Sequence, residues 1–225
     1  MGGRMIDVLG DGSAPRLVVF DLDGTLYPKE AYAEQVLAVI GRMFVELRGS
    51  SQAHADEKVA GLREAMRTNW SGTSTTSFVR ANGFDVAQWL EYREAHLSIA
   101  DGLVRDEDVV RDLARLREVV PIVLLTNNTR GAMTAILDKV GLGTGGFTQV
   151  FTSEDSRDTP KPDPGAFQVV LDRCGVPAER TWSVGDRVDI DIAPLVRLGG
   201  SGIAVDGPAD LRAAVDHLIG LVRRG

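Results

Sequence analysis

The hydrophobic residues of this chain follow two different periods, which divide it into segments. Near the N-terminus a short apolar run, Leu17-Val18-Val19-Phe20, predicts a buried strand. From Glu30 to about Ile99 the apolar residues instead recur every three or four positions, which predicts amphipathic helices. The spacing between Val36 and Leu47 is the clearest example of this pattern. Because strand patterns resume only afterwards, we expect the helical block to be an insertion.

Beyond this block, short apolar runs alternate with helical patterns. The predicted strands are Pro121–Leu125, Gln149–Phe151, Thr181–Val184 and Ile203–Val205. The predicted helices are Asp106–Glu118, Thr129–Val140, Pro164–Cys174 and Ala209–Val222. Strands separated by helices favour a parallel sheet with right-handed crossovers. We therefore expect an α/β fold, a Rossmann-like doubly wound parallel sheet with an inserted α-helical domain.

The patterns also set the expected domain limits. Residues 1–15 carry Gly, Asp and Arg, which favours a flexible N-terminal tail. Residues 16–29 and 100–225 are expected to form the α/β core, and residues 30–99 the helical domain. The run Gly141–Gly146 satisfies the dinucleotide pattern GxGxxG, but it follows a predicted helix and precedes a strand. It is therefore predicted to be a helix end and a turn.

Composition and charge exclude several classes of protein. The 225 residues carry a net charge of -7, which does not suit a nucleic-acid polymer as partner. No apolar run approaches the ~18 residues of a membrane span, and the N-terminus lacks the apolar core of a signal peptide. The single cysteine, Cys174, can form no internal disulfide. We expect a cytoplasmic protein, a monomer or homodimer, that binds neither membranes nor nucleic-acid polymers.

Polar side chains follow three of the predicted strands at the point where each ends. Asp21 and Asp23 follow the first strand, Thr126 and Asn127 follow Pro121–Leu125, and Asp186 follows Thr181–Val184. The carboxyl ends of parallel strands share one edge of the sheet, where ligands bind. Paired carboxylates there suit Mg²⁺, or a nucleophile with a partner acid or base.

A lysine, Lys161, lies between two prolines just before a predicted helix, and the prolines restrict its backbone. Together with the strand-end residues it forms an ordered series of four motifs. These are Asp21-Leu22-Asp23-Gly24-Thr25-Leu26, Thr126, Lys161 in Lys-Pro-Asp-Pro, and Gly185-Asp186 followed by Asp191. The series resembles the motifs of the haloacid dehalogenase-like (HAD) hydrolase superfamily, in its phosphatase branch, over roughly residues 16–206. The first motif with the following Tyr27-Pro28, and the approach to the second strand, are similar in a less specific way to the pyrimidine 5′-nucleotidase-like group.

The resemblance implies a Mg²⁺-dependent phosphatase. Asp21 would attack phosphorus to form an aspartyl-phosphate, and Asp23 would act as general acid and then general base. Asp21, the backbone carbonyl of Asp23, and Asp186 would hold Mg²⁺.

The remaining motif residues receive supporting roles from the same resemblance. Thr126 and the backbone N–H of Asn127 would bind phosphoryl oxygens. Lys161 would neutralise charge on the transferring group. Asp191 would orient Lys161 or a metal-bound water.

The insertion would form a mobile cap over residues 30–99, which closes over the site and selects a small phosphorylated metabolite. The polar loop Trp70–Thr76 is either the part of the cap that faces the core or a surface loop, and Arg130 either binds a substrate charge or covers a helix start.

A nucleoside monophosphate is the first choice of substrate, and a sugar phosphate or phosphoglycolate is the alternative. Retention of Asp23 favours ester hydrolysis over dehalogenation, whereas phosphomutase activity stays open. From a different class, a non-catalytic regulatory or binding module on this fold would be expected to have lost motif residues, and a receiver domain would be shorter.

Overall fold

The computed structural model describes residues 6–69, 73, 75–156 and 159–225. Their contacts divide the chain into two compact units. Met1–Lys29 and Gly102–Gly225 form the first, which we term the α/β unit, and Glu30–Asp101 form the second, the helical unit. The motif residues all belong to the α/β unit.

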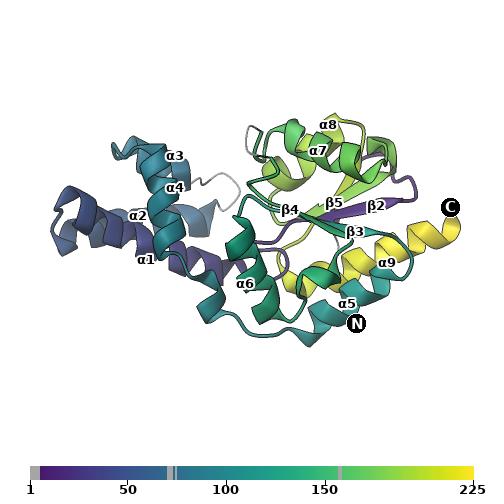
Figure 1. Ribbon diagram of the computed structural model, residues 1–225, viewed down its shortest axis with the longest axis horizontal. Coiled ribbons are helices and arrows are strands. Elements are labelled where there is room, and N and C mark those ends of the chain that lie inside the picture. The colour runs from purple at the N-terminus through teal and green to yellow at the C-terminus, as the bar shows by residue number, and fades with distance from the viewer. Residues whose placement is uncertain (1–5, 70–72, 74, 157–158) are drawn as a thin grey trace. The chain divides into compact units, whose positions relative to one another are not determined.

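A six-stranded sheet in the order β1-β6-β5-β2-β3-β4 forms the centre of the α/β unit (Figure 1). Its strands are β1 (Asp7–Leu9), β2 (Leu17–Phe20), β3 (Ile122–Leu125), β4 (Gln149–Phe151), β5 (Thr181–Gly185) and β6 (Ser201–Ala204). β2 pairs in parallel with β3 on one side and β5 on the other. β3–β4 and β5–β6 are parallel as well, whereas β1 runs antiparallel to β6. The predicted doubly wound α/β fold is confirmed.

Helices cover both faces of this sheet, which explains why β2 and β3 are buried along their whole length. In Figure 1, α7 and α8 lie on one face, and α5, α6 and α9 lie on the other. These helices are α5 (Glu107–Arg117), α6 (Arg130–Val140), α7 (Pro164–Cys174), α8 (Ala193–Arg197) and α9 (Pro208–Arg224). α6 ends at Gly141 in the left-handed conformation, with φ of 87°, so the GxGxxG run begins with a helix end, as predicted.

The prediction of a flexible tail over residues 1–15 is wrong for its described part. Asp7 to Leu9 form β1, whose residues pair with β6 from Ala204 to Gly202. The Trp182 indole N–H also donates a hydrogen bond to the Ser13 carbonyl at 2.8 Å. An edge strand of three mostly exposed residues has no hydrophobic alternation, so its pairing is set by the open edge of β6 and not by its own sequence. Residues 1–5 lie outside the described part of the chain.

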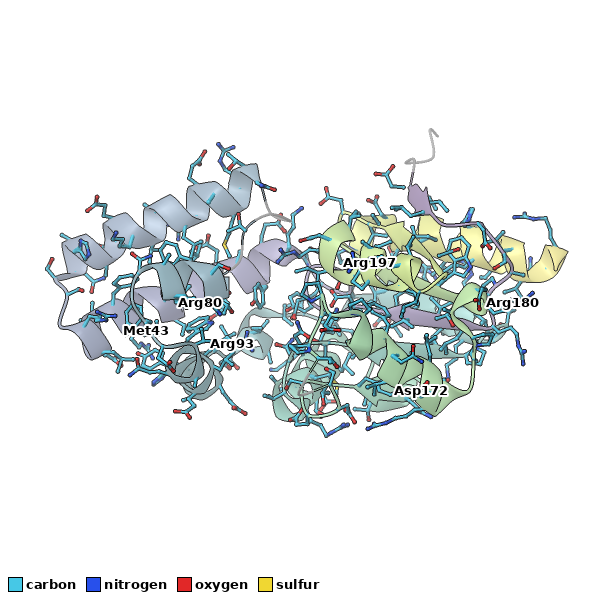
Figure 2. All side chains as sticks on the ribbon, turned by 90° about the horizontal axis from the view of Figure 1, so that it is seen from above. Met43, Arg80, Arg93, Asp172, Arg180 and Arg197 are labelled. Atoms are coloured by element: carbon cyan, nitrogen blue, oxygen red, sulfur yellow. The ribbon has the colours of Figure 1, made fainter. Side chains whose placement is uncertain are left out.

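The helical unit packs α1 (Lys29–Arg48), α2 (Gln52–Thr68), α3 (Thr75–Ala81) and α4 (Val86–His96) around an apolar core of its own. Ile40, Met43 and Trp89 are fully buried within it, and Figure 2 shows Met43 among the side chains of this unit. Of the polar loop Trp70–Thr76, residues 70–72 and 74 lie outside the described residues. Among the helices that the structure describes, none combines the length and apolar character needed to cross a membrane.

Deleting residues 1–10 should destabilise the protein by about 2 kcal/mol, since the β1–β6 hydrogen bonds each contribute on the order of 1 kcal/mol. Thermal unfolding followed by circular dichroism should show a melting temperature several degrees below that of the full chain. Deletion of residues 1–5 alone is the matched control and leaves β1 intact. Equal melting temperatures for the two truncated chains would contradict a structural role for β1.

Candidate active site

The motif residues meet because β2 lies between β3 and β5. Phe20, the last residue of β2, pairs with Leu124 on one side and Val184 on the other. Asp21 therefore leaves the sheet beside the ends of both neighbouring strands, from which Thr126 and Asp186 also emerge. The carboxyl edge of a parallel sheet brings these side chains together, as the sequence predicted.

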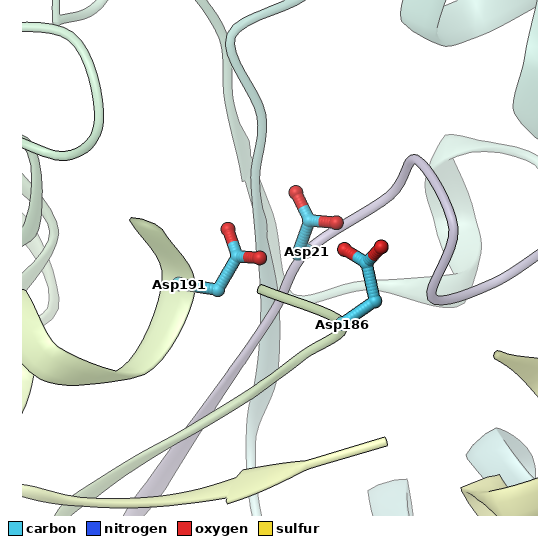
Figure 3. Close-up of side chains that lie close together, drawn as sticks. All are labelled: Asp21, Asp186 and Asp191. Atoms are coloured by element: carbon cyan, nitrogen blue, oxygen red, sulfur yellow. The ribbon is translucent and has the colours of Figure 1, made fainter. Parts of the chain in front are cut away.

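Three carboxylates gather at this edge, from Asp21, Asp186 and Asp191 (Figure 3). One oxygen from each lies within 4.8 Å of the others. An all-oxygen, multiply charged donor set of this kind fits a hard divalent cation such as Mg²⁺. Asp191 belongs to the cluster itself, although the family resemblance implied only a supporting role.

The Lys161 ammonium lies between two of these carboxylates. Its Nζ is 2.6 Å from Asp21 Oδ1 and 2.7 Å from Asp191 Oδ1. Lys161 is only 6% exposed and Asp191 only 2%. Burial by itself lowers the pKa of Lys161, but the charges of Asp191 and Asp21 outweigh it and raise the pKa above that of an exposed lysine. Burial, aided by the charge of Asp21, raises the pKa of Asp191 to about 7.

Hydrogen bonds to the backbone of Lys161 and Pro162 position the Lys161 side chain at the cluster. The Asn127 amide donates to the Lys161 carbonyl at 2.9 Å and accepts from the Lys161 N–H at 3.1 Å. The Arg197 guanidinium, from α8, donates to the Pro162 carbonyl at 3.5 Å; Arg197 is labelled in Figure 2. Sequence reasoning considered only the backbone N–H of Asn127 and missed this function of its side chain.

Asp23 points to a different set of partners. The Tyr27 hydroxyl donates to Asp23 Oδ1, and the Asn128 amide donates to Asp23 Oδ2 at 2.7 Å. The sequence analysis assigned no role to Tyr27 or Asn128. The only available signal was their place beside the first and second motifs.

Thr126 is fully buried and held by neighbouring main chain. Its N–H donates to the Phe151 carbonyl at 3.0 Å, and its Oγ1 accepts from the Asn128 N–H at 3.1 Å. A hydroxyl that accepts in this way keeps its own proton available for a phosphoryl oxygen.

The carboxylate of Asp21 accepts a hydrogen bond at each oxygen. Thr25 donates to Oδ2 at 3.1 Å and Lys161 donates to Oδ1, so both contacts orient this candidate nucleophile.

Two glycines are required by the crowding at this edge. Gly24 has φ of 82°, and a Cβ at this position would lie 2.5 Å from Asp186 Oδ2. A Cβ at Gly185 would overlap the Cβ of Asp191. Both motif glycines therefore leave room for the carboxylates.

Other charged residues near the motifs lie outside the cluster. Asp163 caps α7 by accepting from the Gly165 N–H at 2.8 Å. Asp189 is exposed. The Arg130 guanidinium is 2.8 Å from Asp155, and its backbone N–H donates to Glu154 at the start of α6. These contacts favour the helix-start interpretation of Arg130.

Comparison with known proteins adds independent evidence. A sequence model of the haloacid dehalogenase-like hydrolase family matches residues 15–199. Phosphoglycolate phosphatases of Pseudomonas syringae pv. tomato and Pseudomonas putida are 30% identical over 188 residues and 32% identical over 200 residues. Each alignment covers 81% of this chain and 66% of the relative, just under two thirds of its length. The HAD hydrolase YfnB of Bacillus subtilis, crystallised bound to magnesium, has a similar fold, with TM-score 0.54 and 21% identity over 84% of this chain and 85% of that one.

Replacing Lys161 with methionine should destabilise the metal-free protein by about 3 kcal/mol, because it leaves two buried carboxylates without their cation. The deficit should shrink from about pH 8 to about pH 5, because the folded-state pKa of Asp191 lies above its unfolded value and the folded state takes up this proton first. Thermal unfolding in EDTA at both pH values measures this.

Two further variants test the cause of the loss. Asp191→Asn added to Lys161→Met should recover stability, since it removes one of the facing charges. Lys139→Met, at an exposed helical position, should leave the melting temperature unchanged. A Lys161→Met deficit independent of pH would contradict the electrostatic explanation.

Proposed function

Because the chain belongs to the haloacid dehalogenase-like hydrolase family, we propose that it hydrolyses small phosphate monoesters with the aid of Mg²⁺. The observation that carries this proposal is the separation of two carboxylates. Asp21 lies in the acidic cluster beside Lys161, whereas Asp23 is held outside it by Tyr27 and Asn128. One carboxylate is thus placed for attack and the other for proton transfer.

In the first half of the proposed reaction, a carboxylate oxygen of Asp21 attacks phosphorus. The bond between phosphorus and the ester oxygen breaks, and protonated Asp23 gives its proton to that oxygen, so an alcohol leaves. The phosphoryl group is then bound to Asp21 as an acyl phosphate. Splitting one displacement into two lowers the barrier of each.

In the second half, the Asp23 carboxylate takes a proton from a water molecule, whose oxygen attacks phosphorus. The bond between phosphorus and the Asp21 oxygen breaks, which releases inorganic phosphate and restores both carboxyl groups. The same Asp23 side chain serves as acid and then as base.

The remaining residues bind and stabilise the phosphoryl group. The Thr126 hydroxyl and the backbone N–H of Asn127 bind its oxygens, and Lys161 offsets the charge that develops in the transition state. Mg²⁺, held by Asp21, Asp186 and the backbone carbonyl of Asp23, would reduce the repulsion between the anionic substrate and the carboxylates. Asp191 orients Lys161, to which it is hydrogen-bonded.

For the substrate, we place phosphoglycolate or a sugar phosphate ahead of a nucleoside monophosphate. Both Pseudomonas relatives are phosphoglycolate phosphatases and align over 81% of this chain. The nucleotide preference rested on the first motif with Tyr27-Pro28 and on the approach to the second strand, and the comparisons favour the alternative. We also propose that the helical unit, residues 30–99 in the sequence prediction, is the cap that selects the substrate.

A non-catalytic module of the same fold is the competing hypothesis from a different class. Such a module needs no intact nucleophile, lysine or metal-binding acids. In this chain Asp21, Lys161 and Asp186 are all present and lie at the same edge of the sheet. The complete set therefore supports catalysis.

The purified protein should release phosphate from a panel of phosphoglycolate, sugar phosphates and nucleoside monophosphates in the presence of Mg²⁺. EDTA should abolish release, and Asp21→Asn should reduce it below detection because no nucleophile remains. Asp189→Asn, a change of the same chemistry at an exposed position, should retain activity. Phosphoglycolate or a sugar phosphate should give the highest kcat/KM.

Two results would overturn parts of this proposal. A nucleoside monophosphate as the best substrate would restore the nucleotidase hypothesis. A folded wild-type protein that hydrolyses no ester of the panel would favour the non-catalytic module.

A further inference from the structure

Both oxygens of the Asp23 carboxylate accept a hydrogen bond from a buried side chain. Tyr27 donates to Oδ1 and Asn128 donates to Oδ2, the latter at 2.7 Å. We infer that Tyr27 and Asn128 are positioning residues that fix the Asp23 carboxylate in the orientation needed for proton transfer. This inference rests on the proposed function, in which Asp23 is the general acid and base.

Tyr27 is fixed by the turn that follows the first motif. The N–H groups of Thr25 and Leu26 both donate to the Leu22 carbonyl, at 3.3 Å and 3.0 Å. This turn brings Tyr27 back beside Asp23, four residues earlier, where the two form an isolated β-bridge. The Tyr27 side chain is only 2% exposed, so its packing fixes where the hydroxyl lies.

Asn128 comes from a distant part of the chain and is fixed more tightly. Its N–H donates to Thr126 Oγ1 at 3.1 Å, and its carbonyl accepts from the Ser153 N–H at 3.0 Å. The residue is 5% exposed. The backbone of Asn128 is thus anchored independently of Asp23, and its side-chain amide can hold the carboxylate in place.

These two donors restrain the carboxylate while leaving it able to react. Each carboxylate oxygen offers two lone pairs, and the donors use one on each oxygen. Rotation of the carboxylate about the Cβ–Cγ bond would break both hydrogen bonds together. Accepting these two hydrogen bonds does not by itself use up the lone pairs of the carboxylate, which can still carry the proton that moves to the ester oxygen. The donors therefore lower the entropy that Asp23 must lose before it can transfer this proton.

The test compares leaving groups that differ in their need for a proton. An alkyl oxygen requires one as the phosphorus–oxygen bond breaks, whereas 4-nitrophenolate leaves without it. Values of kcat/KM, which report the phosphoryl transfer to Asp21, are measured for the Tyr27→Phe and Asn128→Ala proteins. The substrates are 4-nitrophenyl phosphate and the alkyl ester of the panel that the wild type hydrolyses fastest.

Each substitution should lower kcat/KM for the alkyl ester about tenfold. This loss is smaller than the full rate contribution of a general acid, which is about 10²- to 10⁴-fold, because Asp23 itself is still present. The value for 4-nitrophenyl phosphate should change by less than about threefold, because proton transfer contributes little to that reaction. Asp23→Asn sets the reference, with a larger loss on the alkyl ester. Gln168→Ala is the matched control, since the exposed Gln168 amide on α7 donates to Asp172 at 2.7 Å, outside the acidic cluster, and should affect neither substrate.

The outcomes separate the two levels of the hypothesis. If Asp23→Asn shows the leaving-group dependence but neither positioning variant does, the inference about Tyr27 and Asn128 is wrong and the proposed function stands. Equal losses on both substrates would assign the two residues a general structural role and also overturn the inference. A wild type inactive on every ester would overturn the proposed function and the inference with it. Tyr27→Phe removes a single oxygen, so the test holds even if Asn128→Ala does not fold.

Discussion

The ammonium of Lys161 between Asp21 and Asp191 is the interaction on which the rest of the site depends. Two carboxylates this close and this buried are unfavourable unless a cation compensates them. Contacts of 2.6 Å and 2.7 Å make Lys161 that cation. The position of the ammonium must therefore be well defined, and hydrogen bonds to the backbone of Lys161 define it. The side-chain amide of Asn127 donates to the Lys161 carbonyl and accepts from the Lys161 N–H.

The end of β3 links the separate loops of the site. Three consecutive residues at this strand end contact different parts of the site, namely Thr126, Asn127 and Asn128. Asn127 holds the backbone of Lys161, and Asn128 holds the carboxylate of Asp23. The loops after β2 and β4 are thus both tied to the strand that lies between them in the sheet. A distortion at the end of β3 would reach Asp23 and Lys161 together, whereas β1 and β6 lie on the far side of β5.

The sequence predicted those parts of the structure that depend on local pattern. The continuous apolar runs of β2 and β3 marked strands buried on both faces, and the polar residues after them marked the site. The family predicted from the four motifs is confirmed. The strand β1 was not predicted, because its pairing is set by β6. The hydrogen bond from Asn128 to Asp23 was not predicted either, because the two residues are 105 positions apart and meet only in the folded sheet. The nucleotide preference drew on the flank of the first motif, yet the structure uses Tyr27 from that flank to hold Asp23.

The charge balance of the cluster explains how an acidic protein could receive the anionic substrate that we propose for it. Three carboxylates and one ammonium leave two negative charges when all are ionised, since three minus one is two. The repulsion this creates is one reason the pKa of Asp191 is raised to about 7, after burial itself. A divalent cation would supply the two missing positive charges. The overall charge of -7 therefore matters less than this local arrangement. With the cation bound, a phosphate group would meet a site that is neutral in sum and cationic at Lys161 and the metal.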